Sequence, residues 1–130
     1  MTMTARIAVV EDDASVRTAL RRLLETSSHE LQIFESASDF IKNLPRGIPE
    51  CLITDLQMPN MTGLELQHHL NRSGVKIPTI VITAFDEPGT REKCIVAGAV
   101  AYLLKPIRKA VLMDAISEAI EISRQKVVPT

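Results

Sequence analysis

Short aliphatic segments alternate along the chain with segments whose apolar residues recur every three or four positions. The aliphatic segments predict strands at residues 6–10, 31–34, 51–54, 79–82 and 101–104. The recurring pattern predicts helices that begin after residue 13, after residue 36, near residue 62, near residue 90 and near residue 107. Near-continuous aliphatic strands joined by helices are typical of a parallel sheet covered on both faces. The pattern therefore predicts an α/β fold with five strands and five helices.

The expected connections make this sheet doubly wound, because crossovers between parallel strands are right-handed. We expect the flavodoxin-like strand order 2-1-3-4-5, in which the first and third strands are neighbours. That order would bring Glu11 and Asp12, which follow the first strand, close to Asp55, which follows the third. Ligands of open parallel sheets bind outside the carboxyl ends of the strands. The three acids are therefore expected in the ligand crevice.

A cluster of carboxylates at one strand edge repels itself unless a cation enters. Mg²⁺ prefers oxygen ligands and keeps several waters. We predict a site for Mg²⁺, with Mn²⁺ as a substitute, formed by Asp12, Asp55 and the backbone carbonyl of Gln57, with Glu11 holding a metal-bound water.

The same edge carries groups suited to phosphoryl transfer. A carboxylate such as Asp55 can act as a nucleophile toward phosphorus. Lys105 follows the fifth predicted strand and supplies a positive charge, and the Thr83 hydroxyl follows the fourth. Because phosphoryl transfer needs mainly positioning and charge neutralisation, these residues predict phosphorylation of Asp55.

Five motifs in order resemble the receiver domain of two-component response regulators, over essentially the whole chain. They are VVEDD (residues 9–13), ITDLQMP (53–59), MTG (61–63), VITA (81–84) and GAVAYLLKP (98–106). Segments 86–88 and 97–100 look most like receivers that precede a LuxR-type helix-turn-helix.

The resemblance implies that a histidine kinase phosphorylates Asp55, that Glu11, Asp12 and the Gln57 carbonyl bind Mg²⁺, and that Thr83 and Lys105 hold the phosphoryl group. It also implies a switch in which Thr83 moves and Tyr102 rotates inward. That switch would remodel the face formed by the fourth helix, fifth strand and fifth helix. A cis Lys105–Pro106 bond is a further expectation from the family.

Composition narrows the location and the partners. A net charge of −1 leaves no electrostatic footprint for nucleic acid, and the apolar segments are far shorter than a bilayer span. With no signal-peptide pattern, we expect a cytoplasmic protein that binds neither nucleic acid nor membrane. One receiver domain over residues 1–126 with a frayed tail at 127–130 is expected. Arg17, Arg21 and Arg22 are interpreted as a solvated helix face.

Several functions stay open on the sequence alone. The favoured one is a phosphorylation-controlled domain, not a turnover enzyme, that regulates a DNA-binding output domain absent from this chain. A stand-alone receiver acting through protein contacts is the alternative, and the switch face is a candidate surface for a phosphorylation-dependent homodimer. An Mg²⁺-dependent phosphatase with an Asp nucleophile is disfavoured, because Gln57 stands where such enzymes carry a second acid. A flavin binder is disfavoured because acids replace the phosphate loop after the first strand.

Overall fold

The computed structural model describes residues 4–125, which form a five-stranded parallel sheet in the order β2-β1-β3-β4-β5. The strands are β1 (Arg6–Val10), β2 (Glu30–Phe34), β3 (Cys51–Asp55), β4 (Thr79–Thr83) and β5 (Ala99–Leu104). The helices are α1 (Ala14–Leu24), α2 (Ala37–Asn43), α3 (Gly63–Arg72), α4 (Thr90–Val96) and α5 (Lys109–Gln125), with a 3₁₀ turn η1 (Leu44–Arg46). The predicted fold class and strand order are confirmed.

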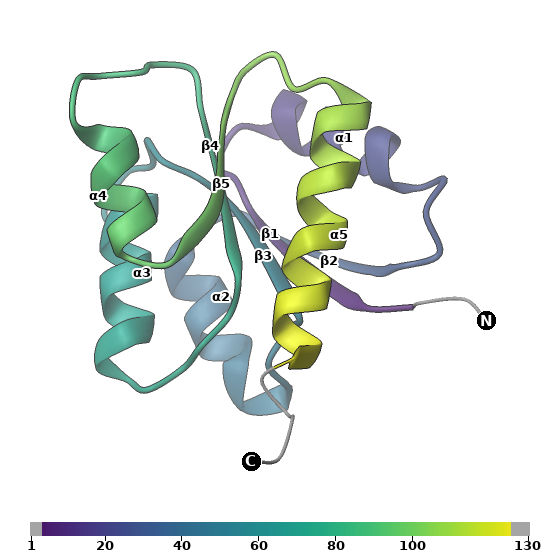
Figure 1. Cartoon of the computed structure of the whole chain (residues 1–130), viewed down its shortest axis with the longest axis horizontal. Helices are drawn as coiled ribbons and strands as arrows, with labels where there is room; N and C mark the ends of the chain where they lie inside the picture. The colour runs from purple at the N-terminus through teal and green to yellow at the C-terminus, as the bar shows by residue number, and fades with distance from the viewer. Residues whose placement is uncertain (1–3, 126–130) are drawn as a thin grey trace.

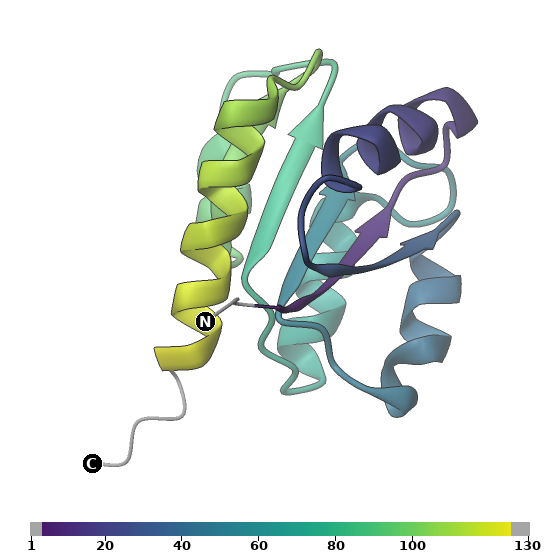
Figure 2. The same cartoon turned by 90° about the vertical axis from the view of Figure 1, so that its right-hand side faces the viewer.

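Helices cover both faces of the sheet, as Figure 1 shows. Apolar side chains of α1 and α5 pack on one face, against residues such as Val9, Ile53 and Ile82. The side chains of α2, α3 and α4 pack on the other, against Ala8, Leu52 and Val81 in two adjoining clusters. Figure 2 shows the strands between these two layers. Because β3 and β4 lie inside the sheet and between the layers, every residue of both strands is buried.

Local capping fixes where three helices begin, as the sequence predicts. The Asp13 side chain accepts hydrogen bonds from the backbone of α1, and Ser36 does the same for α2. Thr62 and Glu65 form the predicted capping box of α3. Because each cap satisfies backbone N–H groups left free by the helix geometry, the loop before each helix is held at a defined angle to its strand.

The first residues of β5 and α5 differ from the prediction. β5 begins at Ala99 rather than at residue 101, and its pairing with β4 shifts register between Thr79 and Ile80. α5 begins at Lys109 rather than near Ile107, because its first backbone bond runs from Leu112 to Arg108. Ile107 still packs on the core, which is why it extends the helical pattern.

Three further predictions concern the backbone and the ends of the chain. The Lys105–Pro106 bond is cis, as expected from the family resemblance. The predicted tail at residues 127–130 lies outside the described residues. Within residues 4–125, no helix is long and apolar enough to cross a membrane.

Candidate functional site

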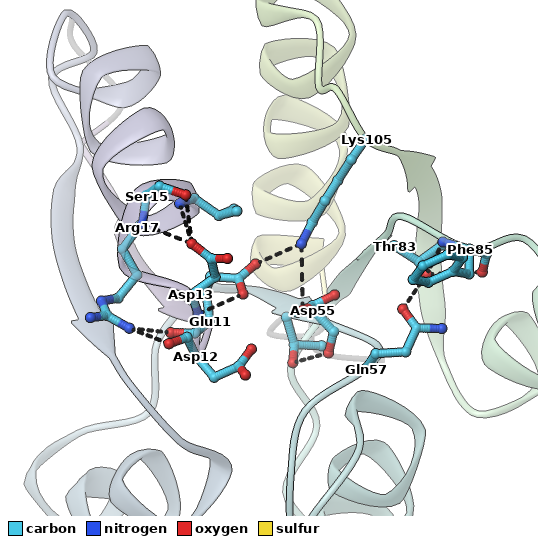
Figure 3. Close-up of polar contacts among 12 residues, drawn as sticks. Glu11, Asp12, Asp13, Ser15, Arg17, Asp55, Gln57, Thr83, Phe85 and Lys105 are labelled. Carbon is cyan, nitrogen blue, oxygen red and sulfur yellow. Dashed lines mark hydrogen bonds and ion pairs between the residues drawn. The ribbon is translucent and has the colours of Figure 1, made fainter.

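The predicted site residues meet at the carboxyl edge of the sheet because the strands are parallel and in register. Val10 pairs with Thr54, so the residues that follow them, Glu11 and Asp55, are neighbours. Carboxylate oxygens of Glu11, Asp12 and Asp55 all lie within 4.8 Å of one another. Thr83 pairs with Leu104 at the ends of β4 and β5, which brings the hydroxyl and Lys105 to the same edge. Figure 3 shows these side chains converging from four strand ends.

Lys105 links the two buried carboxylates. Its Nζ atom lies 3.0 Å from Oε1 of Glu11 and 3.4 Å from Oδ2 of Asp55. Burial by itself lowers the pKa of the Lys105 ammonium, but its hydrogen bond to Glu11 and the charges of both acids outweigh burial, and the pKa is raised. Lys105 is therefore a firmly charged cation at the point where a phosphoryl group on Asp55 would carry its negative charge.

Glu11 is fully buried, and the pKa of its carboxyl group is close to 7. The pKa of Glu11 is raised to about 7, chiefly by burial and to a smaller extent by the negative charge of Asp55, while hydrogen bonds from the Asp13 backbone and from Lys105 act in the opposite direction. The buried acid therefore binds a proton more readily than a glutamate in water, because burial disfavours its charged form.

Asp55 is only 4% exposed. Its Oδ1 atom is buried without a hydrogen-bond partner among the described residues, whereas Oδ2 faces Lys105. A buried carboxylate oxygen without a partner is costly. The all-oxygen donor set and this orphaned atom fit a hard divalent cation such as Mg²⁺. The backbone carbonyl of Gln57, two residues beyond Asp55, stays a predicted ligand.

Gly63 allows the chain to pass closely behind Asp55. A Cβ atom at this position would collide with the backbone carbonyl oxygen of Asp55. The Gly63 N–H also donates to the carbonyl of Leu56 at 2.9 Å. The first turn of α3 is thus packed directly on the end of β3. The sequence motif contained Gly63, but this contact depends on how α3 returns to the sheet, which the motif alone did not indicate.

Arg17 holds the loop between β1 and α1, contrary to its interpretation as part of a solvated helix face. Its side chain is only 20% exposed. The guanidinium donates to the backbone carbonyls of Glu11 and Asp12 at 3.0 and 2.9 Å, and to the Glu35 carboxylate at 3.1 Å. Asp13 fixes the other end of the loop by capping α1, and hydrogen bonds from the Ser15 hydroxyl and from the backbone of Val16 and Ser15 hold its pKa below the usual range.

The Thr83 hydroxyl is engaged away from Asp55. It lies 2.7 Å from Oε1 of Gln57 and 3.0 Å from the carbonyl of Phe85, and it accepts a hydrogen bond from the Phe85 N–H at 3.1 Å. Thr83 itself is buried, but both of its partners are exposed. Figure 3 shows Gln57 reaching across to Thr83 from the turn after β3. The involvement of the Gln57 side chain was not predicted.

Tyr102 lies apart from the acidic cluster, among apolar neighbours. Its ring is buried with Leu56, Val81 and Cys94 on the α4 side of β5. Its hydroxyl donates to Oδ1 of Asp86 at 3.1 Å. Burial, together with this hydrogen bond and the charge of Asp86, raises the pKa of Tyr102 to about 12. The aromatic ring is therefore already turned inward in this structure, and the predicted switch role stays a prediction.

A family model described as the response regulator receiver domain matches residues 7–117. The chain belongs to the response regulator receiver family. Among curated relatives, the transcriptional regulatory protein TdiR of Thauera aromatica is 35% identical over 119 residues, which are 92% of this chain and 52% of TdiR. The transcriptional regulatory protein FixJ of Rhizobium meliloti is 33% identical over 115 residues, covering 88% of this chain and 56% of FixJ.

Solved structures agree with this assignment. The crystal structure of FixJ-N superposes with a TM-score of 0.84 at 32% identity, over 93% of this chain and 96% of that one. A response regulator receiver protein from Burkholderia phymatum gives a TM-score of 0.77 at 38% identity, over 89% of this chain and 94% of the other. The receiver spans about half the length of the curated relatives it matches.

Receiver domains are signalling domains, and they generally bind Mg²⁺ at an acidic pocket and are phosphorylated by histidine kinases. The acidic cluster of this chain stands where such a pocket is expected, at the carboxyl edge of β1 and β3. The family assignment removes the basis for a flavin-binding function, which rested on the sheet order alone.

Proposed function

We propose that residues 1–126 form a receiver domain in which Asp55 accepts a phosphoryl group from a histidine kinase with the help of Mg²⁺. The observation that carries this proposal is the environment of the Asp55 carboxylate. One of its oxygens is buried without a partner, the other faces Lys105, and two further carboxylates lie within 4.8 Å.

The residues that would hold Mg²⁺ are Glu11, Asp12 and Asp55, together with the backbone carbonyl of Gln57. Mn²⁺ would fit the same oxygen donors. When bound, the cation supplies positive charge that neutralises oxygens of the transferring phosphoryl group.

The protein's own residues supply position and charge. A carboxylate oxygen of Asp55 forms the new P–O bond as the P–N bond to the kinase histidine breaks, and the departing imidazole takes up a proton. Lys105 already lies 3.4 Å from Asp55 and would hold a phosphoryl oxygen by charge. The Thr83 hydroxyl would donate to another oxygen after it leaves Gln57, because a charged acceptor binds a hydroxyl more strongly than a neutral amide does.

Movement of Thr83 would carry the signal toward Tyr102 and the face formed by α4, β5 and α5. The relatives TdiR and FixJ are named as transcriptional regulatory proteins, and the matched residues span only 52% of TdiR and 56% of FixJ. We therefore propose that this receiver controls a DNA-binding output domain and binds no nucleic acid itself. A stand-alone receiver is the competing outcome, and phosphorylation-dependent dimerisation through the same face is compatible with both.

Intact-mass spectrometry tests phosphorylation directly. Incubation with acetyl phosphate and Mg²⁺ should add the mass of one phosphoryl group, and chelation of the metal should prevent the addition. Asp55→Asn should abolish it, whereas Asp13→Asn should not, because asparagine keeps the helix cap and Asp13 lies outside the metal cluster. If the wild-type protein gains no mass from acetyl phosphate or from a cognate kinase, the proposal is wrong. Steady hydrolysis of p-nitrophenyl phosphate would instead favour a turnover phosphatase.

A further inference from the structure

The loop between β1 and α1 carries two of the proposed metal ligands on a short segment without regular structure. Glu11 and Asp12 follow the last residue of β1, and Asp13 already caps α1. The direction of each carboxylate is set by the backbone of this segment. An error of a fraction of an ångström in that backbone would matter, because Mg²⁺ demands near-ideal octahedral geometry.

One guanidinium group fixes both peptide units of that segment. The two N–H groups of Arg17 Nη1 serve the carbonyls of Glu11 and Asp12, at 3.0 and 2.9 Å, while Nη2 binds Glu35 at 3.1 Å. In Figure 3, the Arg17 guanidinium lies to the left of the loop and contacts its backbone, while the carboxylates of Glu11 and Asp12 extend to the right. The planar fork of arginine can hold two carbonyls and a carboxylate at once, which the single ammonium of lysine does not match.

The charge of Arg17 is balanced locally. A bare cation beside an acidic cluster would oppose the entry of a divalent ion, but the Glu35 carboxylate pairs with this guanidinium. Arg17 and Glu35 together therefore add little net charge. Their remaining effect on the site is geometric, since the carbonyls they hold belong to the residues that carry Glu11 and Asp12.

We infer that Arg17 is a positioning residue for the metal site, which orients Glu11 and Asp12 by binding their backbone carbonyls from outside the site. This inference rests on the proposed Mg²⁺-dependent function. The positioning role and a purely electrostatic role predict opposite changes in Mn²⁺ affinity when Arg17 is replaced. Loss of a positive charge should tighten cation binding if electrostatics dominated, whereas loss of the two carbonyl contacts should weaken it.

Mn²⁺ binding, counted from the electron paramagnetic resonance signal of the free ion, measures this without any phosphotransfer. Arg17→Met should weaken Mn²⁺ binding by about ten-fold, the lower end of the loss found when groups that orient metal ligands are removed. Arg21→Met is the matched control. It makes the same change on the same helix, at an exposed residue with no side-chain hydrogen bond within residues 4–125, and its affinity should equal that of the wild type.

Arg17→Lys separates geometry from charge, and it also serves if Arg17→Met does not fold. Lysine keeps the positive charge but loses the fork, so Mn²⁺ binding should remain weakened. A merely structural role would lower the free energy of unfolding of the metal-free protein and leave the Mn²⁺ affinity of the folded protein unchanged.

The two proposals fail differently. Arg17→Met binding Mn²⁺ as tightly as Arg21→Met, or more tightly, would overturn the positioning role alone. A wild-type protein that binds no Mn²⁺ would overturn the proposed function, and the positioning role with it.

Discussion

The two halves of the site edge are held in different ways. At the ends of β1 and β3, the acidic half is fixed by charged side chains: Lys105 joins Glu11 to Asp55, and Arg17 holds the backbone of the loop. At the ends of β4 and β5, the hydroxyl half depends on exposed partners. Thr83 bonds to Gln57 and Phe85, and Tyr102 bonds to Asp86.

This difference suggests a division of labour between the halves. Buried charge-assisted contacts are expensive to break, because the freed groups have no water to replace the lost partner. Among the described residues, no ion pair holds Thr83 or Tyr102, and their hydrogen bonds reach residues that are themselves exposed, so these bonds cost less to exchange. The acidic half is therefore suited to present a preformed acceptor. The hydroxyl half is suited to change partners when a phosphoryl group arrives, which is what a two-state switch requires.

The largest expected effect comes from removing the positive charge of Lys105, which contacts both Glu11 and Asp55. Lys105→Met should slow phosphorylation of Asp55 by acetyl phosphate by about 100-fold or more, as when one charge-stabilising donor is lost from an active site. The initial rate is measured by intact mass. Lys109→Met is the control, because Lys109 is exposed and contacts only the Thr26 hydroxyl among the described residues. A near-normal rate in Lys105→Met would contradict the role given to this lysine.

The pH dependence of stability tests the electrostatics of the acidic half in metal-free protein. The pKa of Glu11 is about 7 in the folded state and 4.5 in the ordinary, unfolded state, so the folded state binds the proton more tightly. The stabilisation from this proton is fully present below about pH 4.5. That contribution should be lost as the pH rises from 4.5 through 7, by a few kcal/mol in the free energy of unfolding. Denaturant titrations in the presence of a chelator at pH 5 and pH 8 measure the change.

Two substitutions sharpen the pH test. Glu11→Gln should flatten the slope between pH 5 and pH 8. Glu50→Gln should leave it unchanged, because Arg124 holds the pKa of Glu50 below its ordinary value and this group stays ionised over that range. Equal slopes in wild type and Glu11→Gln would show that another group dominates.

Gly63→Ala should disturb the acidic half through the backbone of Asp55. The added methyl group collides with the Asp55 carbonyl oxygen, and overpacking of this kind costs about 1–3 kcal/mol. Thermal or denaturant unfolding measures the loss. The sign of the change in the free energy of unfolding tests the collision, because without it alanine would stabilise a helix position relative to glycine by about 1 kcal/mol. A variant at least as stable as the wild type would mean that the end of β3 tolerates displacement.

The smallest effect is expected in the hydroxyl half. Gln57→Met removes one acceptor that competes for the Thr83 hydroxyl. Affinity for beryllofluoride, a phosphoryl mimic, should rise by roughly two- to five-fold, which corresponds to the net value of one hydrogen bond. Fluorine NMR measures binding without the complication of hydrolysis. In a Thr83→Val background the gain should vanish, and a gain that persists there would place its cause elsewhere.

Much of the fold follows from local sequence signals. The aliphatic segments and the caps at Asp13, Ser36 and Thr62 depend on neighbours within a few residues, and all appear as predicted. The starts of β5 and α5 do not. The first residues of β5 were missed where its pairing with β4 is irregular, whereas Ile107, a loop residue that packs on the core, imitates the pattern of a helix. The short 3₁₀ turn η1 carried no apolar period that could reveal it.

The meeting of the acids could be predicted because a parallel sheet brings successive strand ends to one edge, whatever the side chains do. The contacts of Arg17 and of the Gln57 side chain could not. Both depend on which rotamer a long side chain adopts and on the angle between a helix and a neighbouring loop. For Arg17, the only hint in the sequence is its place about one helical turn after the acids of residues 11–13. The sequence offered none for the Gln57 side chain.

The ion pair between Glu11 and Lys105 joins residues 94 positions apart in the chain. No fragment that ends before the fifth strand contains both of its members, so an unfinished chain emerging from the ribosome carries Asp55 without the cation beside it. The charge pair beside Asp55 therefore forms only once the polypeptide has been made as far as Lys105 and the sheet has closed around it.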